Sequence, residues 1–179
     1  VEGYEADDVI GTLAFQAVYR AERRGKRKTR KDAEKIEVVI VTGDRDMMQL
    51  VGPRIKVYAP VKGMSEARIF DYQAVEEKMG VKPEEIVDFK SLVGDPSDNY
   101  PGVPGIGPKT AAQLLHQYQT LDNLYKHLDK LSEVQAQKLA EGKESAELSR
   151  RLAKIVVDVP LELDLEKAQF VLTDEEKAK

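Results

Sequence analysis

The sequence predicts an α/β fold, with a partial parallel sheet and flanking helices, followed by an all-helical region. Three observations predict this. Residues 36–42 read Ile-Glu-Val-Val-Ile-Val-Thr, a nearly continuous β-branched run typical of a strand covered on both faces. That run lies between two helical patterns, an order that indicates an α/β layer with a parallel sheet. From Tyr72 onward the spacing of apolar residues is helical.

The elements of the first part follow in order along the chain. Residues 5–24 are predicted to be helical, because Ile10, Leu13, Ala14 and Ala17 recur at helical spacing. A polar, basic connection over 25–35 leads into the strand, and a short helix follows at about 45–51. Residues 54–58 and 67–70 are predicted to form an edge pair of strands.

The second part is predicted to contain helices over 72–79, 83–93, 108–118, 120–128 and 144–157. An apolar stripe of Leu148, Leu152, Ile155 and Val156 supports the last of them. Residues 135–143 are polar and fit either a loop or a helix. The stretch after Pro160 is acidic, as expected of a frayed end or a linker.

Composition narrows the class of protein. The chain has 179 residues, of which 41% are hydrophobic, and it contains no cysteine. This composition suits an ordinary hydrophobic core without disulfides. No apolar run approaches the roughly 20 residues of a membrane helix. The net charge is -4, yet residues 20–31 carry eight basic side chains and one acid, Glu22. Since the first residue is Val, we expect the chain to start inside a longer protein.

Two acidic groups lie at the starts of predicted helices. Glu5-Ala6-Asp7-Asp8 falls in a first turn, where carboxylates interact favourably with the helix dipole. Gly43-Asp44-Arg45-Asp46 directly follows the predicted buried strand, and ligands collect at the carboxyl ends of strands in open α/β sheets. Both groups have a structural alternative, because first-turn acids and aspartate caps are common.

A third acidic group, Gly94-Asp95-Pro96-Ser97-Asp98-Asn99, lies between helices and also suits a simple turn. Hard divalent cations such as Mg²⁺ prefer oxygen ligands. Two ions roughly 3.5–4 Å apart can hold the attacking and leaving oxygens of a phosphoryl displacement. The seven carboxylates of the three groups could form such a site if their segments converge.

A glycine-rich segment follows, Pro101-Gly102-Val103-Pro104-Gly105-Ile106-Gly107-Pro108-Lys109-Thr110-Ala111. Its glycines allow a tight hairpin, and Pro108 suits the first position of a helix. The free N–H groups of that helix form an anion site to which Lys109 adds charge. The segment resembles a helix-hairpin-helix motif, which binds phosphates and reads no bases. A helix–helix turn with a capping glycine is the alternative reading.

The order of these four motifs resembles the 5′→3′ exonuclease domain of bacterial DNA polymerase I, within the wider flap-endonuclease or 5′ nuclease family. The resemblance runs from residue 1 to about 163, with the N-terminal portion missing. It implies a PIN-like sheet with a helix-hairpin-helix (H3TH) region beside it. It also implies two Mg²⁺ or Mn²⁺ ions, and K⁺ at the carbonyl groups of the hairpin.

The resemblance also implies roles for individual residues. One ion would be served by Glu5, Asp7 and Asp8. The other would be served by Asp44, Asp46 and Asp98, with Asp95 in a supporting role. The catalytic carboxylates would be Asp7, Asp44, Asp46 and Asp98. The DNA-binding residues would be Gly102, Gly105, Ile106, Gly107, Lys109 and Thr110.

The implied activity is hydrolysis of DNA phosphodiester bonds by a 5′→3′ exonuclease or structure-specific 5′ flap endonuclease, in primer removal and repair. Implied partners are branched, 5′-flap or nicked DNA and a polymerase domain of the same parent chain, in a cytoplasmic monomer. We expect a nuclease core over 1–71, a DNA-binding region over 72–160 and an acidic tail or linker over 161–179.

The family's N-terminal aspartates and its arch are absent from the sequence. We therefore expect this chain alone to hold metal poorly and to cut slowly or not at all. A non-catalytic DNA-binding fragment with an incomplete metal site is the alternative, and an RNA-cutting relative is disfavoured by the hairpin. The basic connection over 23–35 fits a solvated loop better than a DNA contact. His116 and His127 fit ordinary helix positions, and Met47 and Met48 fit a core.

Overall fold

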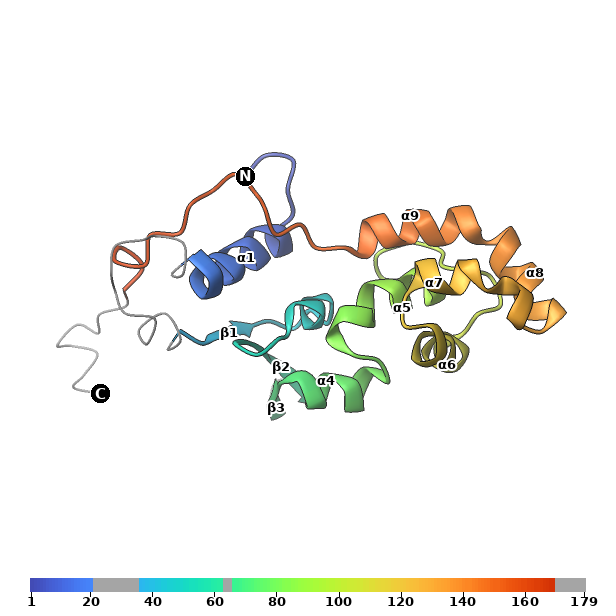
Figure 1. The fold of residues 1–179 in the computed structure, drawn as a ribbon. Helices are drawn as coiled ribbons and strands as arrows, with labels where there is room; N and C mark the ends of the chain where they lie inside the picture. Colours follow the sequence, from blue (N-terminus) through green and yellow to red (C-terminus); the bar gives the residue numbers. More distant parts are fainter. Residues whose placement is uncertain (21–35, 63–65, 170–179) are drawn as a thin grey trace. The chain divides into compact units, whose positions relative to one another are not determined.

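The computed structural model describes residues 1–20, 36–62 and 66–169 (Figure 1). These residues belong to two compact units, Val1–Val38 with Val156–Lys179 and Val39–Ile155. The basic connection over 23–35 lies outside the described residues. In the part of the chain that is described, no helix has both the length and the apolar character needed to cross a membrane.

The first unit is built on helix α1 (Ala6–Phe15), which continues as a π-helical segment, η1 (Gln16–Arg20). The helix predicted over 5–24 is therefore confirmed up to residue 20. Asp8 lies in the first turn and accepts a hydrogen bond from the backbone N–H of Glu5 at 3.1 Å. This contact stabilises the start of α1 in the way expected of a first-turn carboxylate.

A polar face of α1 holds the segment that follows residue 155. Asp8 accepts from the backbone N–H of Val156 at 2.7 Å, and Thr12 accepts from that of Val159 at 3.2 Å. Gln16 accepts from the backbone N–H of Leu163 at 2.8 Å. Because Asp8, Thr12 and Gln16 are spaced four residues apart, they share one face of the helix. The start of the predicted tail is thus hydrogen-bonded to α1.

The second unit contains a three-stranded sheet in the order β1 (Val38–Val41), β2 (Ile55–Lys62), β3 (Glu66–Phe70). The predicted edge pair is confirmed: β2 and β3 are antiparallel, with Val57 opposite Phe70. The prediction that β1 is covered on both faces is wrong. Ile40 is 5% exposed, but Val39 and Val41 are 48% and 75% exposed. Alternate residues face opposite sides, and the described residues cover only the Ile40 side.

The short helix after β1 is a 3-10 turn, η2 (Asp46–Leu50). Met47 and Met48 are 0% and 1% exposed, so their prediction as core residues is confirmed. Their side chains anchor this turn to the core and leave Asp46, which starts it, at the surface end of the segment.

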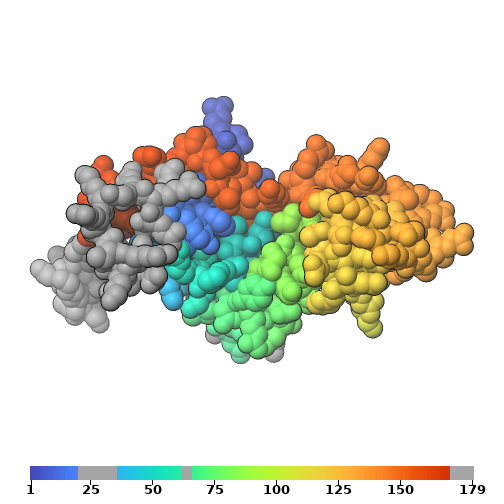
Figure 2. All heavy atoms as spheres, in the orientation of Figure 1, coloured from blue at the N-terminus to red at the C-terminus, as the bar shows by residue number. Residues whose placement is uncertain are grey.

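The helical region confirms most of the predicted elements. It contains α4 (Tyr72–Met79), η3 (Pro83–Glu85), α5 (Ile86–Val93), α6 (Pro108–Tyr118), α7 (Leu121–Lys126), η4 (Leu128–Lys130), α8 (Glu133–Glu141) and α9 (Lys143–Ala153). Helix α5 packs against α6 and α9. In the space-filling view these helices form a continuous green-to-orange surface within the second unit (Figure 2).

Two boundaries needed tertiary information. The segment over 135–143, left open between loop and helix, belongs largely to α8, whose first turn is capped by Ser132. Helix α9 ends at Ala153 instead of the predicted 157. The side chain of Gln49 binds the backbone at the end of the helix: it donates to Ala153 O at 2.9 Å and accepts from the N–H of Ile155 at 3.1 Å. These contacts draw the chain out of the helix.

Candidate metal centre and nucleic-acid interface

Asp46 is positioned by a chain of local hydrogen bonds at the end of β1. Thr42 Oγ1 accepts from the backbone N–H of Asp44 at 3.0 Å, and Asp44 Oδ1 accepts from that of Asp46 at 2.8 Å. Asp44 therefore closes a local turn just before η2, whose N-cap position is Arg45 and not the predicted Asp44. Its carboxylate is exposed and is not among the three that gather below.

Asp95 and Asp98 lie on a tight loop after α5. The backbone groups of Asp95 and Tyr100 pair in both directions, at 3.0 and 3.2 Å, which closes the loop. Gly94 and Gly102 let its two ends meet. A Cβ on Gly102, where φ is 63°, would lie 2.2 Å from the backbone nitrogen of Gly94. The loop is therefore held by backbone contacts that a larger residue would prevent.

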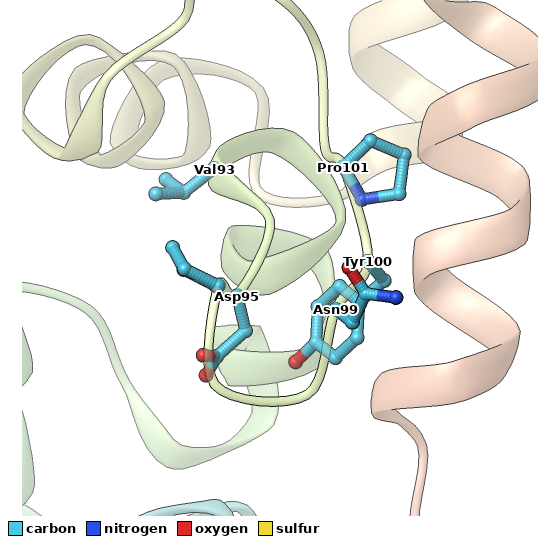
Figure 3. A pocket seen from close by; sticks show the side chains of 6 residues that line it. Val93, Asp95, Asn99, Tyr100 and Pro101 are labelled. Atoms are coloured by element: carbon cyan, nitrogen blue, oxygen red, sulfur yellow. The ribbon is translucent and has the colours of Figure 1, made fainter.

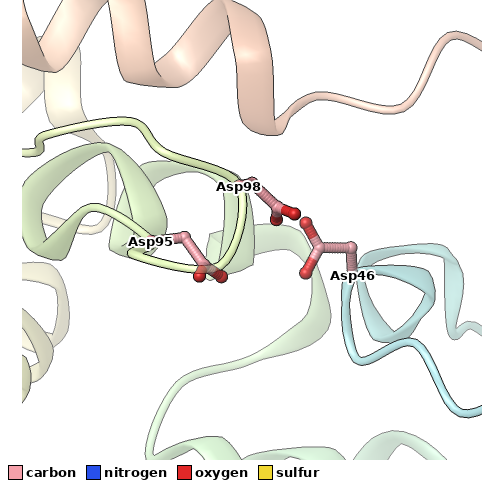
Figure 4. A group of neighbouring side chains, drawn as sticks. All are labelled: Asp46, Asp95 and Asp98. Atoms are coloured by element: carbon pink, nitrogen blue, oxygen red, sulfur yellow. The ribbon is translucent and has the colours of Figure 1, made fainter.

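The structure brings together Asp46, Asp95 and Asp98, each of which offers a carboxylate oxygen within 4.8 Å of the others (Figure 4). Asp46 comes from η2, and the other two come from the loop after α5. Two of the three acidic groups named from the sequence, those over 43–46 and 94–99, thus contribute to one three-carboxylate group. It lies wholly in the second unit.

Lys90 of α5 is the residue that the sequence analysis missed. Its side chain is 8% exposed, and its ammonium group pairs with Asp46 and, at 2.8 Å, with Asp95. A signal was available: Lys90 lies one helical turn after Ile86, at a position that helical spacing places on the same, buried face. A buried lysine needs partners, which here are two of the three carboxylates.

The pKa values reflect this arrangement. Burial raises the pKa of Asp46, and the nearby Asp44 and Asp98 add to the effect, although the bond from Lys90 opposes it. For Asp95, burial is outweighed by hydrogen bonds from Lys90 and Ser97, which lower its pKa to about 2. For Lys90, burial is outweighed by its bonds to both carboxylates, so its pKa is raised.

The donor set fits a hard divalent cation. Asp95 has both oxygens engaged, one by Lys90 and the other by the N–H and hydroxyl of Ser97. Among the described residues, no group donates a hydrogen bond to the Asp98 carboxylate, and Lys90 bonds to Asp46 through one oxygen, Oδ1. Asp46 and Asp98 therefore have oxygens available to a cation, while Asp95 holds Lys90 in place.

The remaining predicted carboxylates belong to the first unit. Asp8 is engaged by the backbone N–H groups of Glu5 and Val156, so it has a structural role there. Asp7 lies in the first turn of α1 and is half-buried, and Glu5 precedes the helix and is exposed. The assignment of these three residues to a metal stays a prediction.

Two serines of α9 hydrogen-bond to the backbone of the hairpin between α5 and α6. Ser149 Oγ accepts from the N–H of Gly102 at 3.0 Å, and Ser145 Oγ donates to Gly102 O at 2.7 Å. Helix α6 then starts at Pro108 after Gly107, with Lys109 exposed and Thr110 half-buried in its first turn. The side chain of Ile106 is 5% exposed and belongs to the core, so it is not available for contact with DNA, and the predicted role of Ile106 would rest on its backbone.

A second residue missed from the sequence is Lys138 of α8. Its ammonium donates to Gly105 O at 3.3 Å, and its stem covers Gly105, where φ is 81°. The hairpin tip thus carries a positive charge from α8 in addition to Lys109. Spacing alone could not reveal this, because Lys138 lies 33 residues from the hairpin.

A shallow hollow of about 290 Å³ lies on the loop, lined by Val93, Asp95, Pro96, Asn99, Tyr100 and Pro101 (Figure 3). Only Asp95 is common to the hollow and the three-carboxylate group. The hollow is therefore a neighbouring feature and not the cation site itself.

Comparison with known proteins covers nearly the whole chain. Residues 1–80 match the family described as 5′-3′ exonuclease, N-terminal resolvase-like domain, and residues 81–176 match 5′-3′ exonuclease, C-terminal SAM fold. DNA polymerase I of Bacillus caldotenax is 43% identical over 99% of this chain and 19% of its own length. The 5′-3′ exonuclease of Bacillus subtilis is 40% identical over 98% of this chain and 54% of its own length.

Solved structures show the same fold. The 5′-exonuclease of bacteriophage T5, solved with divalent metal ions (zinc), aligns with a TM-score of 0.67 at 19% identity, over 87% of this chain and 52% of that one. The T5 D15 flap endonuclease, solved with DNA and metal ions, gives 0.64 at 18% identity, over 88% and 51%. The chain thus spans about half the length of these relatives or less. It belongs to the 5′-3′ exonuclease family.

Proposed function

We propose that this chain is part of a metal-dependent 5′→3′ exonuclease or structure-specific 5′ flap endonuclease that hydrolyses DNA phosphodiester bonds. The observation that carries the proposal is the three-carboxylate group, in which Asp46 and Asp98 come from distant parts of the sequence and share one site. Family membership supports the same reading. A cation site suits phosphoryl chemistry because negative charge develops on the phosphate oxygens.

In this proposal Asp46 and Asp98 bind a Mg²⁺ or Mn²⁺ ion directly, and Asp95 supports them through Lys90. The ion, when bound, supplies positive charge that stabilises the phosphate. Metal-binding roles are proposed as well for Asp44 and for Glu5, Asp7 and Asp8 of the first unit, and two ions in all. The three carboxylates and Lys90 together carry a net charge of about -2 at neutral pH, which one divalent ion balances.

The hairpin is proposed to bind the DNA backbone. Gly105, Gly107 and the N–H groups of Lys109 and Thr110 form the start of α6, where a phosphate is favoured. Exposed Lys109 adds a positive charge at this end of the helix. The carbonyl groups of the same hairpin are proposed to take K⁺. The contacts would be independent of base sequence, since backbone contacts carry no sequence information.

The wider assignments are proposals as well. The substrate is proposed to be 5′-flap or nicked duplex DNA, bound by a cytoplasmic monomer whose parent chain also carries a polymerase domain. The nuclease core is proposed to span 1–71, the DNA-binding region 72–160 and a linker 161–179. The names of the relatives and the DNA complex of the T5 enzyme support the choice of DNA as substrate.

The test is Mg²⁺-dependent cleavage of a labelled 5′-flap duplex by this chain and by its Asp46→Asn and Asp98→Asn variants. Asp129→Asn is the matched control, because Asp129 is an exposed aspartate of η4 outside the site. We expect the two site variants to lose about 10²-fold or more in rate, as when a charge-stabilising group is removed. DNA binding in EDTA should be retained.

Equal cleavage by the control and both site variants would refute the catalytic assignment. Flap binding without any cleavage by the unsubstituted chain would favour the alternative, a DNA-binding fragment with an incomplete metal site. The complete hairpin, with its two lysines, is the observation that keeps this alternative in view.

A further inference from the structure

One buried polar atom lacks a partner. Among the described residues, the hydroxyl of Tyr100 is the only buried side-chain nitrogen or oxygen without a hydrogen bond. The residue is 4% exposed. Because leaving a buried hydroxyl unpaired costs roughly 1–3 kcal/mol, such a group needs a reason.

The ammonium of Lys90 lies 6.0 Å from the centre of the Tyr100 ring. Two of the three donors of that ammonium are used by Asp46 and Asp95. In Figure 3 the hydroxyl of Tyr100 and the carboxylate of Asp95 lie toward the same end of the loop. A hydroxyl without a partner and an ammonium with one unused donor thus lie in the same part of the second unit.

We propose that Tyr100 is a positioning residue of the cation site. Its hydroxyl accepts a hydrogen bond from the Lys90 ammonium when a divalent cation is bound to Asp46 and Asp98. The inference rests on the proposed function, because it requires that these carboxylates bind a cation. In the cation-bound site Lys90 would gain Tyr100 as a partner, and the Tyr100 hydroxyl would gain the hydrogen bond that it lacks.

Two positive charges would compete for the Asp46 carboxylate. A cation on Asp46 competes with the Lys90 ammonium for the same carboxylate and repels it. Asp95 stays bound to Lys90, since Ser97 fixes its other oxygen. The ammonium therefore needs to exchange only Asp46, and a lysine end group can pivot about its flexible stem. Tyr100 is the acceptor next to it.

Without the hydroxyl, the displaced ammonium would be left short of a partner in a buried place, and cation binding would weaken. A hydrogen bond to a charged group corresponds to about a tenfold or larger change in affinity. If Tyr100 only fills space, removing its unpaired hydroxyl should leave cation binding unchanged.

The experiment measures Mn²⁺ affinity by titration calorimetry or electron paramagnetic resonance, for the unsubstituted chain and for Tyr100→Phe. Tyr125→Phe is the matched control, because the Tyr125 hydroxyl donates to Leu139 O at 3.2 Å within the helical region. We expect Tyr100→Phe to bind Mn²⁺ about tenfold more weakly, with stability in EDTA unchanged or higher. Tyr125→Phe should lose stability and keep its Mn²⁺ affinity.

Adding Tyr100→Phe to Lys90→Met completes a double-mutant cycle. We expect Tyr100→Phe to cause no loss of Mn²⁺ affinity in the Lys90→Met background, because the partner of the hydroxyl is gone. An equal loss in both backgrounds would overturn the proposal. If Lys90→Met does not fold, the comparison of Tyr100→Phe with Tyr125→Phe decides.

The outcomes separate this inference from the proposed function. Unchanged Mn²⁺ affinity in Tyr100→Phe, with binding by the unsubstituted chain, overturns the role of Tyr100 alone. No Mn²⁺ binding by the unsubstituted chain overturns the metal site and this inference with it.

Discussion

Replacing Lys90 by methionine removes the charge from the ammonium group between Asp46 and Asp95 while keeping most of the apolar stem. The three side chains are 8%, 15% and 21% exposed, so two poorly solvated carboxylates would be left side by side. Breaking a buried ion pair costs about 3–5 kcal/mol, and the partial exposure of Asp95 favours the lower end. We therefore expect a loss of about 3 kcal/mol in the free energy of unfolding, measured in EDTA at neutral pH.

The loss should depend on pH. The pKa of Asp95 is about 2, below its usual 3.8, so this carboxyl stabilises the fold above that usual value and loses the effect as pH falls toward 2. A depression of this size corresponds to about 2 kcal/mol. Removing Lys90 takes away much of it. The difference between variant and unsubstituted chain should therefore be largest above about pH 4 and shrink below it.

The assay is urea unfolding followed by far-UV circular dichroism, in EDTA, from about pH 7 to about pH 3. Lys143→Met is the matched control: its ion pair with Glu147 spans 3.9 Å between side chains that are 56% and 60% exposed. Such a pair contributes about 0.5 kcal/mol. A loss below about 1 kcal/mol for Lys90→Met, or a loss that does not change with pH, would refute the reasoning.

Three further predictions follow from the same geometry. Gly102→Ala should lower the free energy of unfolding in urea by more than about 3 kcal/mol, because its Cβ would meet the backbone of Gly94. Gly52→Ala, with open space around it, should cost far less, and similar losses in the two variants would contradict the close approach. Arg150→Met should lower the free energy of unfolding by about 2–3 kcal/mol, since Arg150 pairs at 3.0 Å with the buried Asp88 side chain. A change within about 0.5 kcal/mol, the usual range for surface sites, would show that the pair contributes little. Lys109→Ala should weaken DNA binding for all sequences and reduce the salt slope by about 1, and a strongly sequence-dependent loss would rule out a phosphate contact.

Local signals predicted many of the elements. Helix α6 begins at Pro108 after Gly107, as the preference for proline at the first helical position predicts. Helix α4 ends at Met79, and the next residue, Gly80, has a φ of 73° that is typical of a glycine at the C-terminal end of a helix. At these positions the cause lies within a few residues of the effect, so the sequence was sufficient.

The contacts that build the site were harder to predict. The sequence supplied Asp46, Asp95 and Asp98 as candidates, but their meeting depends on how η2 and the loop after α5 fold against a common core. The pairing of Lys90 with two of them, and of Lys138 with Gly105, joins different elements. No local preference encodes such contacts.

The end of the chain shows the same limit. Its acidic composition fits a frayed end or a linker, and composition gave no sign that Asp8 and Thr12 of α1 and Gln16 of η1 bond to the backbone N–H groups of Val156, Val159 and Leu163. Helix α9 ends at Ala153 because the side chain of Gln49 hydrogen-bonds to the backbone of Ala153 and Ile155. In both cases side chains about 100 residues or more away decide the local conformation.

The central claim is that Asp46 and Asp98 form one divalent-cation site in which Asp95 holds Lys90. Anomalous diffraction from crystals of the chain soaked in Mn²⁺ tests it most directly, because it locates the ion. The account predicts a Mn²⁺ peak within coordination distance of carboxylate oxygens of both Asp46 and Asp98, with Lys90 still bonded to Asp95. Mn²⁺ bound elsewhere, with neither carboxylate in contact, would contradict it.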